Sequence, residues 1–388
     1  MKNSFLIVLL STAALLFHGC AKEDAQDLPL SSEANEKPLL ADHFSHLAME
    51  HIPKVVISKG DALSGLSIAD RKKLQLTHIR DSAWAGMIGR TSFYESSEMV
   101  VTPSNRSYIF PGSILRASSI ASDEFQPLFG YGRLPIRANL SFPSSLAVGT
   151  INDPTLSESR IFLRNAIMAP DFSGYYVDDF QRTIAYFSRY EEVKLSYGYN
   201  VNERRLFSSV NSSFDHNSSS TNYATKLIVS YTVKNFTYSM PDPLANELID
   251  ISTITAETFN GFSPVFINSV TYGRYGILVV ETQQNASSME NVFDKVVKKI
   301  FKQSSETFTQ EEKNLFNSCR VTVHLLGSTL GESTIQLLLN PDPESMSSFM
   351  SENVGTFTAA DPGVPISFTA KYLADNSLFK TTFQIDFP

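Results

Sequence analysis

The 388-residue sequence is poor in cysteine, in tryptophan and in basic charge. It has only two cysteines, Cys20 and Cys319, which excludes a scaffold of several disulfides. Lysine and arginine number 32 against 40 acidic residues, and the net charge of −8 argues against nucleic acid as a partner. The apolar run at the amino terminus, residues 5–17, is too short to span a bilayer as a helix.

Motifs of enzymes and of metal sites are also missing from the sequence. It contains no Gly-x-Ser-x-Gly, no phosphate-binding glycine loop and no His-Glu-x-x-His. His43, His46 and His51 lie close together, but no pattern of cysteines or carboxylates completes a metal site, so we interpret them as surface residues. Cys319 stands beside Arg320 without a recognisable histidine partner, which favours a structural thiol over a nucleophile. We therefore expect a non-enzymatic protein with no catalytic residues, no metal and no cofactor.

Residues 1–19 have the layout of a signal peptide. Lys2 supplies a positive charge, residues 5–17 form the apolar run, and Gly19 precedes Cys20. An apolar run before Gly-Cys resembles a bacterial lipoprotein signal, in which cleavage leaves Cys20 as the lipidated first residue. An ordinary cleaved secretion signal is the alternative. We expect either a secreted protein or a lipoprotein anchored to the outer membrane.

Residues 20–53 are acidic and polar, which predicts a flexible, solvated tether. The segment Lys22-Glu23-Asp24 resembles the surface-export signal of Bacteroidota lipoproteins, and a merely hydrophilic spacer is the alternative. We expect residues 54–388 to form the folded module.

Four segments alternate apolar and polar residues in the manner of half-buried strands. They are residues 193–201, 227–238, 265–281 and 321–325. In the second, the apolar positions change parity after Asn235, which predicts a bulge. In the third, Gly273 and Gly276 predict a sharp bend. With short mixed elements over 54–150 and further strands expected at 334–339, 364–370 and 378–387, the pattern predicts an α+β fold.

Two connections between these strands are much longer than ordinary hairpin loops of about 2–5 residues. The first, residues 202–225, is rich in serine and asparagine, and the second is residues 283–319. Apolar residues of the second have the spacing of one face of an amphipathic helix: Met289, Phe293, Val296, Val297, Ile300 and Phe301. Two decorated hairpins with helices packed on a sheet, or insertions with a function of their own, both fit this pattern.

Fragments of the sequence match a known family in their order along the chain. The run Ser263–Arg274 resembles Pro-Val-Tyr-Ile-Ser-Ser-Val-Ala-Tyr-Gly-Arg, Phe110–Ala117 resembles Tyr-Pro-Gly-Ala-Leu-Leu-x-Ala, and Leu325–Ser328 resembles Val-Leu-Gly-Gly. The matching motif positions include Pro111, Gly112, Tyr272, Gly273 and Arg274. Over roughly residues 100–380 the chain thus resembles the cholesterol-dependent, or thiol-activated, cytolysins, and most closely their short relatives from Bacteroidota.

The resemblance implies a perforin/cytolysin-like fold: a bent four-stranded antiparallel sheet flanked by two helical clusters, with additional C-terminal strands. In that family the two clusters unfurl into transmembrane β-hairpins and many subunits close a large β-barrel. Residues 202–225 and 283–319 would be the two clusters, with Gly273, Gly276 and Gly327 at a bend or hinge. The membrane-inserting candidates are Phe207, Val210, Phe214, Met289, Phe293, Val297 and Phe301.

The sequence departs from the family's pattern at two places. Ser328 replaces the second glycine of the pair that begins at Gly327. Members with a membrane-recognition domain continue well beyond the position of Asn376 and carry a tryptophan-rich loop, whereas this sequence has only Trp84. We therefore expect that the module lacks the C-terminal membrane-recognition domain, and with it cholesterol recognition through that loop.

Residues 289–301 also fit an inserted strand incompletely, because apolar side chains fall on both strand faces. This favours a pore that depends on a partner. By analogy we expect the short component of a two-component system, in which a longer cytolysin-like homologue, an activating protease and target membrane lipid lead to a homo- or hetero-oligomeric ring. The alternative is a non-lytic surface lipoprotein that binds a glycan or a protein.

Overall fold

The computed structural model describes twelve segments of the chain. They are residues 38–57, 77–101, 105–121, 125–172, 179–187, 225–255, 257–284, 286–300, 306–328, 331–339, 341–354 and 358–387. All of them belong to one compact unit, Pro38–Pro388. No helix in these segments is long and apolar enough to cross a bilayer.

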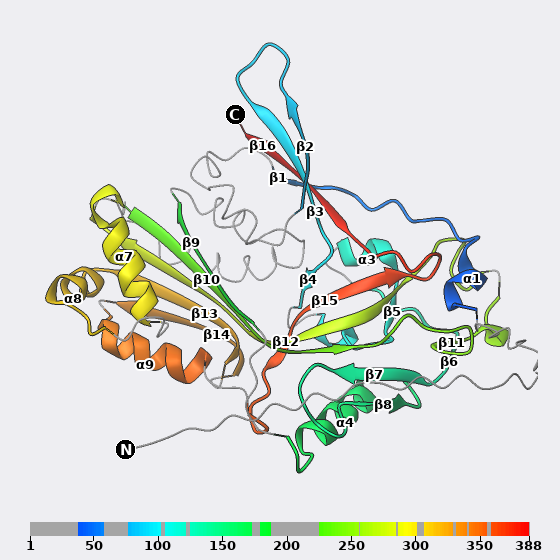
Figure 1. Ribbon diagram of the computed structural model, residues 1–388. Coiled ribbons are helices and arrows are strands. Elements are labelled where there is room, and N and C mark those ends of the chain that lie inside the picture. Colours follow the sequence, from blue (N-terminus) through cyan, green and yellow to red (C-terminus); the bar gives the residue numbers. More distant parts are fainter. Residues whose placement is uncertain are drawn as a thin grey trace, which may run out of the picture. The chain divides into compact units, whose positions relative to one another are not determined.

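The largest sheet is built around β12, Val265–Thr282, which is paired with β10, Thr225–Ser239, along most of its length (Figure 1). The sheet order is β14-β13-β12-β10-β7-β8, with β9 paired to β10, with β15 and β5 paired to β12, and with β4 paired to β15. The other strands of this sheet are β4 (Met99–Val100), β5 (Ile114–Leu115), β7 (Ile136–Leu140), β8 (Val148–Ile151), β9 (Asp179–Phe187), β13 (Arg320–Ser328), β14 (Gly331–Leu339) and β15 (Val364–Tyr372).

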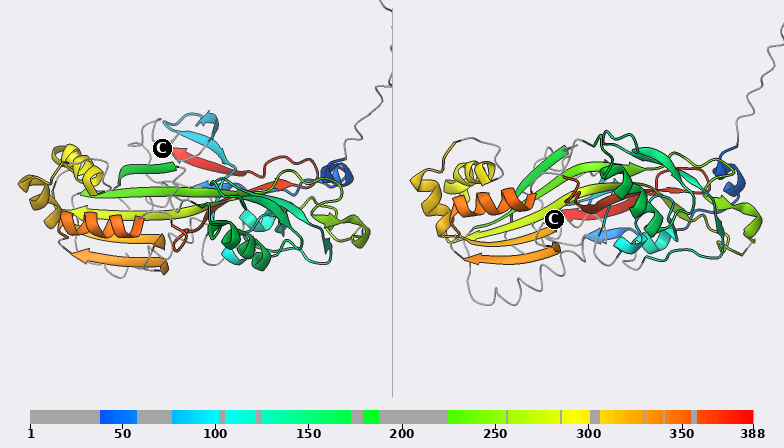
Figure 2. Two further views of the ribbon diagram at one scale, coloured as in Figure 1. Left: turned by 60° about the horizontal axis from the view of Figure 1, so that its bottom comes forward. Right: turned by 90° about the horizontal axis from the view of Figure 1, so that it is seen from below.

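Three helices cover one end of this sheet, on the strands β10, β12 and β13 (yellow to orange in Figure 2). They are α7 (Ala286–Ile300), α8 (Gln310–Asn317) and α9 (Pro343–Val354). At the other end, α4 (Leu156–Ile167) packs beside β8 over a second part of the core. Smaller elements of that end are α1 (Leu40–Phe44), η2 (Arg106–Tyr108), α3 (Ala117–Ala121), η3 (Ile251–Thr253) and the paired strands β6 (Gly132–Arg133) and β11 (Ile249–Asp250).

A separate four-stranded sheet has the order β1-β16-β3-β2. It consists of β1 (Val55–Ile57), β2 (Thr77–Ala83), β3 (Arg90–Ser96) and β16 (Thr381–Phe387), so the two ends of the described chain contribute to it together. Strand β1 is parallel to β16, and the other pairs are antiparallel.

Most strands lie where the sequence predicts them, and the α+β class is confirmed. The bulge predicted at Asn235 is present, because the register between β10 and β12 shifts between Lys234 and Phe236. The segment 283–319 lies between the end of β12 and the start of β13, as predicted. Four strands border the two long connections, and β14 adds a fifth at the edge.

One predicted boundary is corrected by the structure, and another stays a prediction. The predicted strand 193–201 and nearly all of the predicted connection 202–225 lie outside the described residues; the described strand that precedes β10 and pairs with it is β9, and residues 188–224 lie between these two strands. The folded unit begins at Pro38 rather than at residue 54. Helix α1 buries Leu40 and Phe44 in the core, and these apolar side chains fix the last part of the expected tether.

Candidate functional site

Strand β12 changes its neighbour in the middle, and this is where it bends (Figure 1). On one side β15 pairs with residues 265–273 and β13 pairs with residues 275–281. A Cβ atom at Gly273 would lie 1.9 Å from the carbonyl oxygen of Val233 on β10, so only glycine allows this close approach of the two backbones. We call residues 273–276 the bend.

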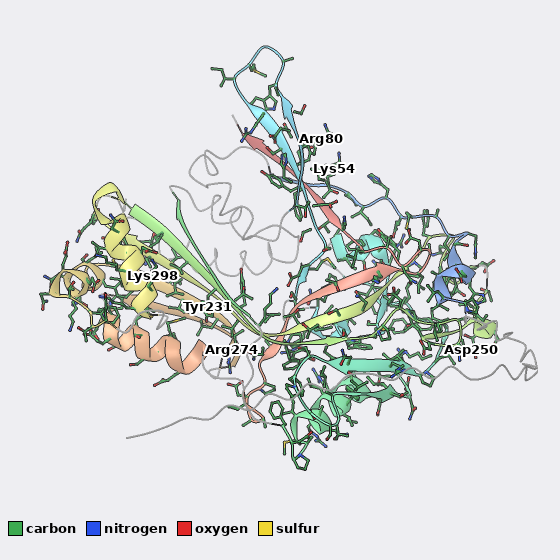
Figure 3. The ribbon with its side chains drawn as sticks, viewed as in Figure 1. Lys54, Arg80, Tyr231, Asp250, Arg274 and Lys298 are labelled. Carbon is green, nitrogen blue, oxygen red and sulfur yellow. The ribbon has the colours of Figure 1, made fainter. Side chains whose placement is uncertain are left out.

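Tyr231 of β10 lies opposite Gly276 and fills the space left by the missing side chain. A Cβ atom at Gly276 would lie 2.2 Å from the tyrosine ring, and Tyr231 is almost completely buried. Burial raises the pKa of the Tyr231 hydroxyl well above its ordinary value. The glycine is therefore matched to an aromatic residue on the paired strand. Figure 3 labels Tyr231 and Arg274 beside the bend.

Arg274 lies in the bend and is buried with its charge. Its side chain is 1% exposed, and its Nη2 atom lies 2.5 Å from Oδ2 of Asp361. A buried guanidinium is tolerated only when hydrogen-bonded counter-charges compensate for the lost hydration. Asp361 belongs to a segment that follows α9 and leads into β15. The sequence match at Arg274 gave no indication of this partner.

The segment containing Asp361 covers the bend, and we call residues 358–363 the strap. Besides the ion pair, Nδ2 of Asn235 donates a hydrogen bond of 3.1 Å to the carbonyl oxygen of Pro362. Gly363 has a φ of +79°, and a Cβ atom there would lie 2.6 Å from the carbonyl oxygen of Gly273. The strap therefore holds the bulge of β10 and the bend of β12 against one another.

We call the segment 283–319 the second insertion; its described residues include helices α7 and α8, which pack against the sheet. One face of α7 is fully buried against the β10, β12 and β13 side chains, as its apolar spacing predicts: Phe293, Val296, Val297 and Ile300. Burial of four such side chains stabilises the helix by several kcal/mol, at roughly 1.5–3 kcal/mol each.

A buried ion pair joins the two helices of the second insertion. Nζ of Lys299 lies 2.7 and 2.9 Å from the two carboxylate oxygens of Glu312, and it also donates to the carbonyl oxygen of Thr307 at 2.9 Å. Both side chains are 4% exposed. Burial alone raises the pKa of Glu312, but hydrogen bonds from Lys299 and from Thr309 outweigh it and hold this pKa below its usual value.

A second buried pair closes the base of the second insertion. Glu281, near the end of β12, and Arg320, at the start of β13, are register partners, and Oε2 of Glu281 lies 3.5 Å from Nε of Arg320. Cys319 precedes Arg320 and is also buried. Burial raises the pKa of this thiol to about 12, against the opposing effect of hydrogen bonds with Thr282 and Ser318. A thiol in this state is poorly reactive, which agrees with the predicted structural role.

The structure brings together only some of the predicted residues. Four of them lie at or beside the bend: Tyr272, Gly273, Arg274 and Gly276. Gly112 lies elsewhere, in a turn with a φ of +84°, where its N–H donates to the carbonyl oxygen of Ile267. Gly327 lies in β13. Five candidates lie outside the described residues: Cys20, Phe207, Val210, Phe214 and Phe301. Met289 lies in α7, but its side chain is not among those that the structure describes. Their roles stay predictions.

Sequence reasoning missed the partners that fix the site. Asp361 contacts Arg274 at the bend and Pro362 contacts Asn235 at the bulge, each from more than 80 residues away in the chain, and no local pattern indicates such contacts. By contrast, the sequence does carry a signal for the start of α8, because Thr309 and Glu312 are spaced as in a capping box, and the structure shows that they form one. Within the described segments, no group of three or more His, Cys, Asp or Glu side chains is placed to hold a metal ion.

Residues 90–386 match the family model described as thiol-activated cytolysin. The chain belongs to this cytolysin family. It is 24% identical to pneumolysin of Streptococcus pneumoniae over 305 residues, which cover 74% of this chain and 61% of pneumolysin. It is 21% identical to tetanolysin of Clostridium tetani over 277 residues, which cover 69% of this chain and 51% of tetanolysin. Cytolysins are not enzymes, in agreement with the absence of catalytic motifs.

Solved cytolysin structures share the fold. A non-hemolytic pneumolysin from Streptococcus pneumoniae strain ST306 superimposes with a TM-score of 0.63 at 19% identity, covering 90% of this chain and 73% of the other. Listeriolysin O also gives a TM-score of 0.63, at 15% identity, covering 89% of this chain and 71% of the other. The chain spans about 61% of the length of the pneumolysin that it matches in sequence.

Proposed function

We propose that this cytolysin-family protein forms pores by assembling into a ring and converting residues 188–224 and 283–319 into membrane-spanning β-hairpins. One observation carries the proposal. A single row of register partners crosses β9, β10, β12 and β13: Phe187, Lys226, Glu281 and Arg320. Both long connections therefore leave the sheet at the same row. Continuing the four strands past this row would make two adjacent hairpins in one sheet.

The lengths of the two connections support this proposal. Residues 188–224 and 283–319 contain 37 residues each. A hairpin that spans a bilayer needs about 9–11 residues per strand, so either connection is long enough for two spanning strands and a turn. Backbone groups in lipid must pair with neighbouring strands, which requires ring assembly before or during insertion.

The side chains of the second insertion favour a partner-dependent pore. In an extended strand, Val292, Val296 and Ile300 would lie on one face, and Phe293 and Val297 on the other. Four of these five residues are fully buried in the helical form, so the sequence stabilises the stored helix strongly. We propose a secreted or lipid-anchored short component, activated by a protease and assembled with a longer homologue on the target membrane.

Dye release from vesicles, together with electron microscopy of the same sample, tests the pore. The protein is added alone, after protease treatment, and with a longer homologue from the same organism. We expect rings and dye release only with the homologue and the protease. Dye release by the protease-treated protein alone would refute the two-component mechanism, and an absence of rings under all conditions would favour a non-lytic lipoprotein that binds a glycan or a protein.

A matched pair of labelled variants tests the conversion itself. In a Cys20→Ser background, an environment-sensitive fluorophore is attached to Lys295→Cys, exposed on α7, or to Arg137→Cys, exposed on β7. Position 295 lies in the row of Phe293 and Val297, which is the predicted lipid-facing row. We expect a blue shift on membrane assembly at position 295 alone. Equal responses at both positions would contradict insertion of residues 283–319.

A further inference from the structure

An open pocket of about 270 Å³ lies between α4, η2 and the strap. Its apolar wall includes Ile109, Leu163 and Val364, and its polar lining includes three arginines, Arg106, Arg160 and Arg164, together with Tyr272. Figures 1 and 2 show α4 beside the segment that leads into β15. A mainly apolar pocket with a few convergent charged groups is the usual form of a small-molecule site.

Among the residues that the structure describes, no acidic side chain pairs with the arginines of α4. Arg160 and Arg164 are four residues apart on the exposed side of the helix, a spacing at which like charges destabilise a helix slightly. Two exposed guanidinium groups thus line the pocket.

Tyr272 adds a hydroxyl group to the same pocket. Its ring stacks on Phe236, with ring centroids 4.9 Å apart and an interplanar angle of 10°, so its orientation is fixed. Burial raises the pKa of this hydroxyl to about 12, and Arg160 and Arg106, which line the same pocket, oppose the shift electrostatically. A neutral tyrosine hydroxyl is a hydrogen-bond donor, as is each arginine.

We propose that this pocket binds a phosphate group that carries an apolar substituent. Arginine pairs with phosphate through two parallel hydrogen bonds, and Arg160, Arg164 and the Tyr272 hydroxyl match the several oxygens and the double negative charge of a phosphate monoester, with Arg106 as a further positive charge in the lining. The apolar wall formed by Ile109, Leu163 and Val364 would accommodate the substituent. Pro362 and Gly363 also line the pocket, so the ligand would contact the strap.

Calorimetric titration of the full chain with octyl phosphate and with inorganic phosphate tests the site. The double variant Arg160→Gln/Arg164→Gln removes two arginines from the exposed side of α4, and Arg137→Gln/Lys295→Gln removes the same charge from exposed positions outside the pocket. We expect octyl phosphate to bind the α4 variant at least about tenfold more weakly than the parent, because charge-assisted hydrogen bonds are lost. The control variant should bind like the parent.

The arms of the experiment also identify the source of the phosphate. Binding of octyl phosphate but not of inorganic phosphate assigns the site to an amphiphile, and flotation with vesicles that contain phosphatidic acid then tests for a lipid headgroup. Equal binding of both probes assigns the site to free phosphate and overturns the proposed role of the apolar wall. Slower hydrogen exchange over residues 358–365 on binding locates the ligand at the strap. Failure of both probes to bind, or equal binding by the α4 variant and the parent, overturns the proposal.

Discussion

The guanidinium group of Arg274 and the carboxylate of Asp361 meet at 2.5 Å, and they join the bend of β12 to the strap. Arg274 is 1% exposed, whereas Asp361 is 34% exposed. The ion pair therefore compensates one deeply buried charge with a partner that water still reaches. Together with the hydrogen bond from Asn235 to Pro362, it holds the strap in place.

We predict that Asp361→Asn lowers the free energy of unfolding by about 1–2 kcal/mol, because the buried Arg274 loses its ion pair with Asp361 and solvent screening limits the loss. Chemical denaturation at neutral pH measures the change. The matched control is Asp153→Asn, which removes an exposed carboxylate 3.8 Å from Arg133 and should change stability by less than about 0.5 kcal/mol. Equal losses in the two variants would mean that burial of Arg274 does not matter.

Gly273→Ala should destabilise the protein by about 2 kcal/mol or more, because the new Cβ would meet the carbonyl oxygen of Val233 at 1.9 Å and neither backbone can retreat within the paired strands. Gly149→Ala is the control. There the nearest atom, at 2.9 Å, belongs to the half-buried ring of Phe162, which can rotate away. Thermal unfolding compares the two variants, and similar losses would show that the backbone contact at the bend is not special.

The strand pattern was predictable from the sequence, and the contacts between distant segments were not. Alternation and its change of parity located β10, β12 and the bulge at Asn235, because local periodicity reports which side chains face the core. Strand β9 was not predicted, because residues 193–201 alternate more regularly and were predicted to be the strand before the first long connection. Asp361 lies 87 residues from Arg274, and a pair at that separation leaves no local pattern.

The start of the folded unit was misplaced for a related reason. The acidic composition of residues 20–53 is typical of a tether when it is averaged over the whole segment. Leu40 and Phe44 are nevertheless fully buried, and α1 is further fixed by a hydrogen bond from the N–H of Leu40 to the carbonyl oxygen of Pro243. Two apolar side chains in one helical turn are enough to dock a short segment, and composition does not reveal them.

Acid should weaken the packing of the second insertion through Glu312. The pKa of this residue in the folded protein lies below its ordinary value of 4.5. Its stabilising contribution is therefore complete above pH 4.5 and is lost as the pH falls through the lower folded pKa. Hydrogen exchange of α7, followed from neutral pH downward after correction for the intrinsic exchange rate, measures this loss.

Glu312→Gln tests the assignment of that pH dependence. At neutral pH we expect this variant to lose about 3 kcal/mol, because the buried Lys299 keeps only the exposed carboxylate of Glu306, 3.8 Å away, as a counter-charge. It should also lose the part of the acid dependence that Glu312 contributes. Glu311→Gln, at the exposed neighbouring position, is the control and should keep both stability and pH profile. An unchanged acid dependence in Glu312→Gln would assign the effect to other groups.

Cys319 should report the release of the second insertion. Its thiol is 1% exposed, donates to the carbonyl oxygen of Leu315 in α8, and has a pKa of about 12 through burial. Because the thiolate is the reactive form, we expect Cys319 in a Cys20→Ser background to react with a disulfide reagent at neutral pH at least about a hundredfold more slowly than an exposed cysteine at Lys295→Cys. Departure of α8 from β13 during assembly would remove the burial and lower this pKa. The thiol of Cys319 in assembled rings should then react almost as fast as it does in denaturant. A slow reaction in rings that release dye would show that α8 stays packed on the sheet. Residues 283–319 would then not convert as a whole.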